Sequence, residues 1–239
     1  MTEVVRCSAR KKCGVGFDFD GTSARSEEVI GKIEAGILTE FDIRADEDFM
    51  AQHTGFRFTD SARTICAAQG LGRPLSEMFR IHKGRIAEAY QGGAIQPVEH
   101  LEEVLQTLSS SGYPLALTTS QRRTNAEPFL KRYDLLRFFN VCLYKDDVRN
   151  GKPHPAIYQK MARRFGLNPR ECVAVEDSTP GFKAAKEAKL TLIALEADHN
   201  RKTADFSLAD YVVKDIREIP PILDSLNHQS STSSTFFIR

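Results

Sequence analysis

The stretch Cys13-Gly14-Val15-Gly16-Phe17-Asp18-Phe19-Asp20-Gly21-Thr22 places two carboxylates directly after a short apolar run. The run from Cys13 to Phe17 is typical of a buried β-strand. Because alternate residues of a strand point to the same side, Asp18 and Asp20 can address one site at the strand's carboxyl end. Two carboxylates this close together predict a bound cation.

Two other interpretations of this stretch fail on single residues. Gly14-Val15-Gly16 would begin a dinucleotide-binding fingerprint only if position 19 were glycine, and it is Phe19. A calcium-binding loop would need an acid or amide at position 22 and glycine at position 23, where this chain has Thr22 and Ser23. The sequence contains no P-loop signature elsewhere.

Beyond Pro97 the sequence alternates amphipathic helical stretches with short apolar runs. One helical stripe consists of Leu101, Val104, Leu105 and Leu108, and helices are also predicted around residues 127–138 and after Pro155 and Pro180. The apolar runs predict strands at residues 113–119, 141–144, 172–175, 191–195 and 211–213. This alternation predicts parallel strands joined by helical crossovers, and such sheets bind ligands at the carboxyl ends of their strands.

The segment between the first predicted strand and Pro97 differs from the rest, because it has helical patterns but no convincing strand. We therefore predict an inserted helical domain of residues 24–95 and a discontinuous α/β domain of residues 1–23 and 96–226. The tail of residues 227–239 is rich in Ser and Thr without periodicity, and we expect it to be disordered.

Polar residues follow three more of the predicted strands. They are Thr119-Ser120, Lys152 in Asn150-Gly151-Lys152-Pro153, and Glu176-Asp177-Ser178. Together with Asp18 and Asp20, these stretches bring hydroxyl groups, an ammonium group and four carboxylates to one edge of the sheet. Hydroxyl and ammonium donors hold phosphate oxygens, whereas carboxylates hold a hard cation, so the set suits a phosphoryl group bound with its metal.

Composition excludes several function classes. The 33 Lys and Arg nearly balance the 32 Asp and Glu, so a net charge of +1 gives no field that would attract nucleic acid or an anionic membrane. Five cysteines without C-x-x-C spacing indicate reduced thiols. The sequence shows no signal-peptide pattern and no apolar run of the roughly 20 residues that span a bilayer. We expect a cytoplasmic protein with a small-molecule partner, and the oligomeric state stays open.

The four motifs, in this order, resemble those of the haloacid dehalogenase superfamily, specifically its helical-cap phosphatase and β-phosphoglucomutase branch. The resemblance covers residues 13 to about 215 and rests on Asp18-x-Asp20, Thr119, Gly151-Lys152-Pro153 and Glu176-Asp177-Ser-x-x-Gly181. It implies an α/β fold with a Rossmann-like parallel sheet, helices on both faces of the sheet and an inserted all-helical cap.

The resemblance also implies an activity, that of a Mg²⁺-dependent phosphatase acting on a small phosphorylated metabolite such as a sugar phosphate. Asp18 would be the nucleophile that forms an aspartyl-phosphate, and Asp20 the general acid and then the general base. Asp18, the carbonyl oxygen of Asp20 and Asp177 would bind the metal, with Glu176 acting mainly through a water molecule.

Phosphate contacts follow from the same resemblance. Thr119 would donate its hydroxyl to the phosphate, Ser120 its backbone N–H at the start of the following helix, and Lys152 would neutralise developing charge. Two arginines depart from the pattern of many relatives, Arg25 in Arg25-Ser26 and Arg57 in Gly55-Phe56-Arg57. One hypothesis is that Arg57 or Arg25 meets an acidic part of the substrate; the alternative is that they are solvated residues of the cap.

Two alternatives to a phosphatase remain open. The first is a phosphomutase of the β-phosphoglucomutase type, but the mutases carry a His and an Arg at the positions that correspond to Ile30 and Phe58 of this chain. The second is a non-catalytic phosphate-binding regulatory protein, which is disfavoured because every catalytic position holds a competent side chain. Asp20 itself favours phosphate esters, since related dehalogenases place Tyr there and phosphonate-cleaving relatives place Ala.

Overall fold

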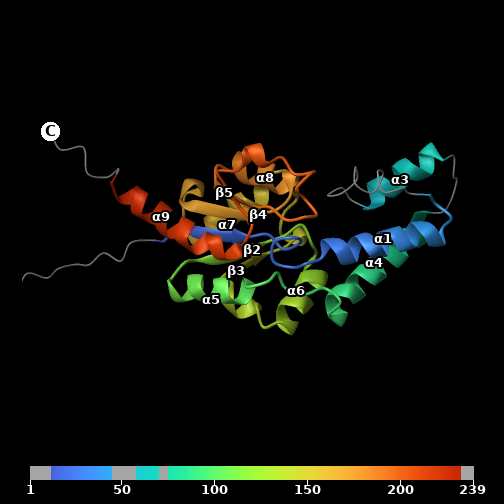
Figure 1. Cartoon of the computed structure of the whole chain (residues 1–239), viewed down its shortest axis with the longest axis horizontal. Coiled ribbons are helices and arrows are strands. Elements are labelled where there is room, and N and C mark those ends of the chain that lie inside the picture. The colour runs from blue at the N-terminus through green and yellow to red at the C-terminus, as the bar shows by residue number, and fades with distance from the viewer. Residues whose placement is uncertain (1–11, 45–57, 70–74, 233–239) are drawn as a thin grey trace, which may run out of the picture.

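A single sheet of six parallel strands forms the centre of the protein (Figure 1). The structure is a computed structural model that describes residues 12–44, 58–69 and 75–232. The strand order is β3-β2-β1-β4-β5-β6, and all five neighbouring pairs are parallel. The strands are β1 (Gly14–Phe17), β2 (Leu115–Thr118), β3 (Val141–Leu143), β4 (Cys172–Glu176), β5 (Thr191–Leu195) and β6 (Tyr211–Val213). The predicted α/β fold is therefore confirmed.

Helices cover both faces of this sheet, as the predicted crossovers require. They are α5 (Leu101–Ser110), α6 (Arg123–Arg132), α7 (Ala156–Phe165), α8 (Thr179–Glu187) and α9 (Ile219–Thr232). Alternate strand residues point to opposite faces, which divides the core in two. Val15 and Val173 belong to the cluster that includes α5, α6 and α9, whereas Ala116 and Ala174 belong to the cluster that includes α7 and α8.

In the described part of the chain between β1 and α5, three further helices extend away from the sheet (Figure 1). They are α1 (Glu27–Glu40), α3 (Phe58–Ala68) and α4 (Leu75–Gly92). Their buried side chains, including Ile37, Phe58 and Met78, form a hydrophobic cluster of their own. The carboxyl-terminal part of α4 instead packs into the main core through Ile86 and Tyr90.

The two connections between the sheet and these helices lie side by side. Arg25 N donates a hydrogen bond of 2.8 Å to Gln96 O, and Val98 N donates one of 3.0 Å to Ser23 O. Chain entry and exit at one place are typical of an inserted domain. This pairing supports our proposal that residues 24–95 form a cap and that residues 1–23 and 96–226 form the α/β domain.

Two local predictions were wrong. The helix predicted around residues 127–138 is α6 followed by a separate 3₁₀ turn at Leu136–Phe138, because Asp134 adopts a left-handed φ of 53° that ends the helix. The tail predicted to be disordered from residue 227 continues α9 as far as Thr232. Asn227 anchors this helix, since its side chain bonds Tyr113 Oη at 2.7 Å and accepts from Cys13 N at 3.3 Å. Residues 233–239 lie outside the described residues.

Candidate active site

The predicted polar residues meet at the carboxyl edge of the sheet. Asp18 follows β1 and Thr119 follows β2. Glu176 is the last residue of β4, and Asp177 follows it. Strand β1 lies between β2 and β4, so the chain crosses to one side of β1 for β2 and β3 and to the other side for β4. Open α/β sheets bind ligands at such a reversal of strand order.

Three carboxylates and one ammonium group form a buried cluster at this edge. Ligand oxygens of Asp18, Glu176 and Asp177 all lie within 4.8 Å of one another. Lys152 Nζ donates to Asp18 Oδ1, to Glu176 Oε1 and, at 2.9 Å, to Thr118 O. The side chain of Lys152 is 4% exposed and that of Glu176 is fully buried. With all four groups ionised, the three carboxylates and the one ammonium group have a net charge of −2.

The pKa values of this cluster reflect that imbalance. Burial, and then the charge of Glu176, raise the pKa of Asp18 well above its usual range, and the same two causes raise the pKa of Asp177. Burial alone would lower the pKa of Lys152, but the charges of Asp18 and Glu176 outweigh it and raise that pKa. Three oxygen ligands with excess negative charge fit a hard divalent cation such as Mg²⁺.

Glu176 is fixed from several sides. Tyr158 Oη donates a 2.5 Å hydrogen bond to its Oε1, and Ser178 Oγ donates one of 3.3 Å to its Oε2. Gly181, in the first turn of α8, leaves the space that the carboxylate fills, because a Cβ there would lie 2.0 Å from Oε2. The glycine of the Glu-Asp-Ser-x-x-Gly motif is thus explained by close packing of α8 on the carboxylate.

Asp177 is fixed by the loop after β1 and by the loop after β5. Thr22 Oγ1 donates to its Oδ1 at 3.2 Å, and His199 Nε2 lies 2.8 Å from its Oδ2. Asn200 Nδ2 donates to the Asp177 carbonyl at 2.8 Å. Gly21 has a φ of 72° and no room for a side chain, since a Cβ would lie 1.8 Å from Asp177 Oδ2.

Asp20 lies beside the cluster and is held by the helices rather than by Lys152. Its Oδ1 accepts a 2.7 Å hydrogen bond from Ser26 Oγ and a second from Tyr90 Oη. Burial and then the charge of Asp20 raise the pKa of Tyr90 well above its usual range, so this hydroxyl stays protonated. Glu27, at the start of α1, has its pKa raised to about 7 by burial, then by the charges of Asp20 and Asp177.

The other predicted residues have different positions. Thr119 is buried, and its hydroxyl accepts a 2.9 Å hydrogen bond from Gln121 N. Ser120 is exposed and lies in a bend, while α6 begins only at Arg123, so the prediction that Ser120 starts the following helix was wrong. Arg25 is exposed. Arg57 lies outside the described residues.

Comparison with known proteins agrees with this geometry. The sequence model of the family described as haloacid dehalogenase-like hydrolase matches residues 15–195. The chain belongs to this family. The match begins in β1 and ends with β5, so it includes the strands that carry Asp18, Thr119 and Glu176 in this haloacid dehalogenase-like protein.

Relatives of this haloacid dehalogenase-like chain include two curated phosphatases and a solved structure. It is 32% identical over 163 residues to phosphoglycolate phosphatase of Escherichia coli (strain K12), covering 68% of this chain but only 63% of that protein. It is 27% identical over 203 residues to validoxylamine A 7'-phosphate phosphatase of Streptomyces hygroscopicus subsp. limoneus, covering 85% and 93%. A HAD family hydrolase from Deinococcus radiodurans R1, solved with bound phosphate and sodium, superposes with a TM-score of 0.74 at 26% identity, covering 90% and 96%.

Sequence reasoning missed five residues that lie around the haloacid dehalogenase-like motifs and interact with their carboxyl groups or backbone. They are Tyr90, Tyr158, Glu27, His199 and Asn200. Tyr90 and Tyr158 look like ordinary members of an apolar helical stripe, and only the tertiary fold shows that their hydroxyls reach carboxylates. His199 and Asn200 follow β5, a strand end whose polar residues could have been counted with those after the other strands.

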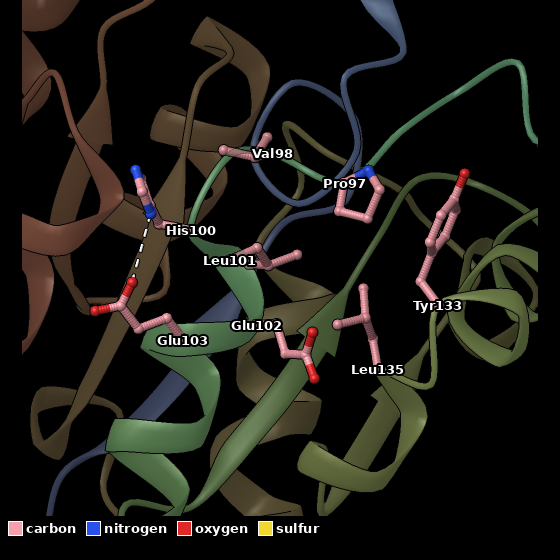
Figure 2. Close-up of a pocket in the computed structure, with 8 residues that line it drawn as sticks. All are labelled: Pro97, Val98, His100, Leu101, Glu102, Glu103, Tyr133 and Leu135. Carbon is pink, nitrogen blue, oxygen red and sulfur yellow. Dashed lines mark ion pairs between the residues drawn. The ribbon is translucent and has the colours of Figure 1, made fainter.

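A surface hollow of about 350 Å³ lies elsewhere on this haloacid dehalogenase-like protein, at the start of α5 (Figure 2). Figure 2 shows its lining, in which His100 and Glu103 form an ion pair of 3.4 Å. The lining residues are Pro97, Val98, His100, Leu101, Glu102, Glu103, Tyr133 and Leu135. None of them belongs to the carboxylate cluster. Among the described helices, none is long and apolar enough to cross a membrane.

Proposed function

We propose that this chain is a Mg²⁺-dependent phosphatase that hydrolyses a small phosphorylated metabolite through an aspartyl-phosphate on Asp18. The observation that carries the proposal is the buried cluster of Asp18, Glu176 and Asp177 with Lys152 at the reversal of strand order. An ionised carboxylate needs no base to act as a nucleophile, and Asp18 lies where its neighbours can bind both a cation and a phosphate.

The oxygen ligands of the cluster support the metal part of the proposal. Asp18, Asp177 and the carbonyl oxygen of Asp20 would hold Mg²⁺, with Glu176 in support through a water molecule. When bound, Mg²⁺ would offset the repulsion between these carboxylates and an incoming phosphate. Lys152 already contacts Asp18 and would neutralise charge on the transferring phosphoryl group.

The proposed reaction has two steps. An Asp18 carboxylate oxygen attacks the phosphorus atom, the ester oxygen leaves, and Asp20 protonates it. Asp20 then removes a proton from water, which attacks the phosphorus of the aspartyl-phosphate and releases inorganic phosphate and free Asp18. The hydroxyl of Thr119 and the backbone N–H of Ser120 would hold the other phosphate oxygens. This assignment agrees with the position of Asp20 outside the Lys152 cluster.

Hydrolysis is favoured over phosphomutase chemistry by the positions that correspond to the mutase His and Arg. Phe58 is buried in the cluster of the inserted helices and stacks on His82 with ring centroids 4.3 Å apart. Ile30 packs against the main core. Neither apolar side chain can bind the second phosphate that a mutase must hold.

The relatives support the substrate class. Two of them are named as phosphatases of phosphoglycolate and of validoxylamine A 7'-phosphate, each a small phosphate ester. We propose the same class for this chain, and the contact of Arg57 with an acidic part of the substrate stays a hypothesis. An altered substrate preference in Arg57→Glu would support that contact, whereas unchanged kinetics across substrates would exclude it.

Phosphate release over a panel of phosphorylated metabolites tests the proposed function. We expect release from small phosphomonoesters with Mg²⁺, loss of release with a chelator, and no release by Asp18→Asn under either condition. Metal-independent release, or full activity of Asp18→Asn, would contradict the proposal.

A further inference from the structure

Asp20 has an asymmetric environment that the family motifs do not explain. Ser26 Oγ and Tyr90 Oη both donate to its Oδ1. Within the described part of the chain, every hydrogen bond to the Asp20 carboxylate ends on this one oxygen. A carboxyl group whose Oδ1 accepts two hydrogen bonds carries its proton on Oδ2. The two donors therefore determine which oxygen can exchange a proton with a substrate.

Tyr90 is itself held firmly. Its ring is fully buried and stacks on Phe19, the residue between the two aspartates, with centroids 5.5 Å apart. Phe129 packs against the Tyr90 ring in an edge-to-face arrangement, with ring centroids 6.5 Å apart. Gln121 Nε2 donates to the Tyr90 hydroxyl at 3.3 Å, and Gln121 N also donates to Thr119 Oγ1 at 2.9 Å. The hydroxyl is thus connected both to Asp20 and to the turn that carries Thr119.

We infer that Tyr90 is a positioning residue for Asp20. Together with Ser26, Tyr90 occupies Oδ1 of Asp20, so that Oδ2 of Asp20 is presented to the leaving oxygen of the substrate. This inference rests on the proposed function. Tyr90 belongs to the carboxyl-terminal part of α4 and Ser26 directly precedes α1, so the two donors come from α4 and from the start of α1. The arrangement ties the orientation of the general acid to the placement of these helices.

The leaving group distinguishes positioning of an acid from a merely structural role. An alkoxide leaves only if it is protonated, whereas p-nitrophenolate is a weak base and leaves without protonation. The quantity to compare is kcat/KM, because it ends with departure of the leaving group and excludes hydrolysis of the aspartyl-phosphate. We therefore compare glycerol 2-phosphate with p-nitrophenyl phosphate in the presence of Mg²⁺.

Tyr90→Phe keeps the ring and removes only the hydroxyl. We expect kcat/KM for glycerol 2-phosphate to fall about 10- to 100-fold, a part of the general-acid contribution, and that for p-nitrophenyl phosphate to stay within about threefold. Tyr113→Phe is the matched control: Tyr113 precedes β2 at the opposite end of the strands, and its hydroxyl bonds Asp224 at 2.7 Å. It should leave both values unchanged. Equal losses on the two esters in Tyr90→Phe, or no loss, would overturn the inference.

Two further variants complete the test. The ratio to follow is kcat/KM for glycerol 2-phosphate divided by kcat/KM for p-nitrophenyl phosphate. In an Asp20→Asn background, Tyr90→Phe should not change this ratio any further, and a further change would overturn the inference. If thermal unfolding shows that Tyr90→Phe does not fold, Gln121→Met removes the donor to Tyr90 Oη and should lower the same ratio; an unchanged ratio would count against the inference. A wild-type chain that cleaves neither ester would instead overturn the proposed function and the inference with it.

Discussion

Glu27 shows at the scale of one residue what the burial of like charges does near this site. Burial and the charges of Asp20 and Asp177 raise its pKa from 4.5 to about 7. A carboxyl group with a raised pKa binds its proton more tightly in the folded state, so folding stability falls as pH rises from about 4.5 to about 7. Above that range, the ionised form of Glu27 opposes folding.

Replacement of Glu27 by an uncharged isostere tests whether the ionisation of Glu27 lowers folding stability. We expect Glu27→Gln to raise the midpoint of thermal unfolding at about pH 8 relative to wild type and to change it little at about pH 4. The measurement is made with a chelator, since a bound cation would offset the same charges. A variant whose shift is the same at both pH values would show that the ionisation of Glu27 does not matter.

The local sequence signals at this scale were sufficient for the motif residues. Asp18, Glu176, Asp177 and Lys152 were each predicted from their place after a strand, and the structure brings all four together. Their supporting hydroxyls were not predictable in this way. Tyr158 lies 18 positions before Glu176 and Tyr90 lies 70 positions after Asp20, so only the packed fold brings them into contact.

At the scale of elements, α8 has to approach β4 closely enough to enclose Glu176. Gly181 permits this approach, because a Cβ there would lie 2.0 to 2.3 Å from the Glu176 carboxylate. Glu176 cannot turn aside without losing its hydrogen bonds to Tyr158, Ser178 and Lys152. The helix and the carboxylate are therefore a single packed unit.

Gly181→Ala should force α8 and the Glu176 carboxylate apart. We expect a loss of about 1–3 kcal/mol in the free energy of unfolding, from overpacking and broken buried hydrogen bonds, together with at least a tenfold loss of phosphate release. Gly84→Ala is the matched control, since Gly84 lies exposed within α4 and, apart from its chain neighbours and its own helix backbone, no atom lies within 4 Å of its Cβ position. That change should add about 0.5–1 kcal/mol of stability by helix propensity. Urea unfolding measures both; a neutral Gly181→Ala would contradict the packing argument.

Element boundaries were predictable where apolar runs were bounded by polar residues. The strands Thr191–Leu195 and Tyr211–Val213 agree with the residues predicted from sequence. Strand β2 is shorter than the predicted run, since Tyr113 and Thr119 lie outside the strand. The break between α6 and the 3₁₀ turn was missed, since apolar residues continue through it. A single left-handed residue, Asp134, ends the helix there.

At the scale of the whole molecule, the sheet brings the carboxylates and Lys152 together at one edge, and residues of α4 and of the start of α1 reach the same edge. Strand order places Asp18 between Thr119 on one side and Glu176 on the other. Helix α4 supplies Tyr90, and Ser26 lies directly before α1, so Asp20 is contacted from the end of α4 and from the start of α1. The parallel sheet with helical crossovers was predictable from the alternation of strands and helices, whereas the strand order and the contacts of α4 with the main core were not.

The most direct test of the account is to locate the phosphoryl group during turnover. Wild-type protein is mixed with p-nitrophenyl phosphate and Mg²⁺, quenched in acid, digested and examined by mass spectrometry, beside Asp18→Asn and a sample with chelator. We predict a phosphoryl group on Asp18 in the wild type with Mg²⁺ and none in either control. Phosphate release without modification of Asp18, or modification of another residue instead, would contradict the proposed mechanism.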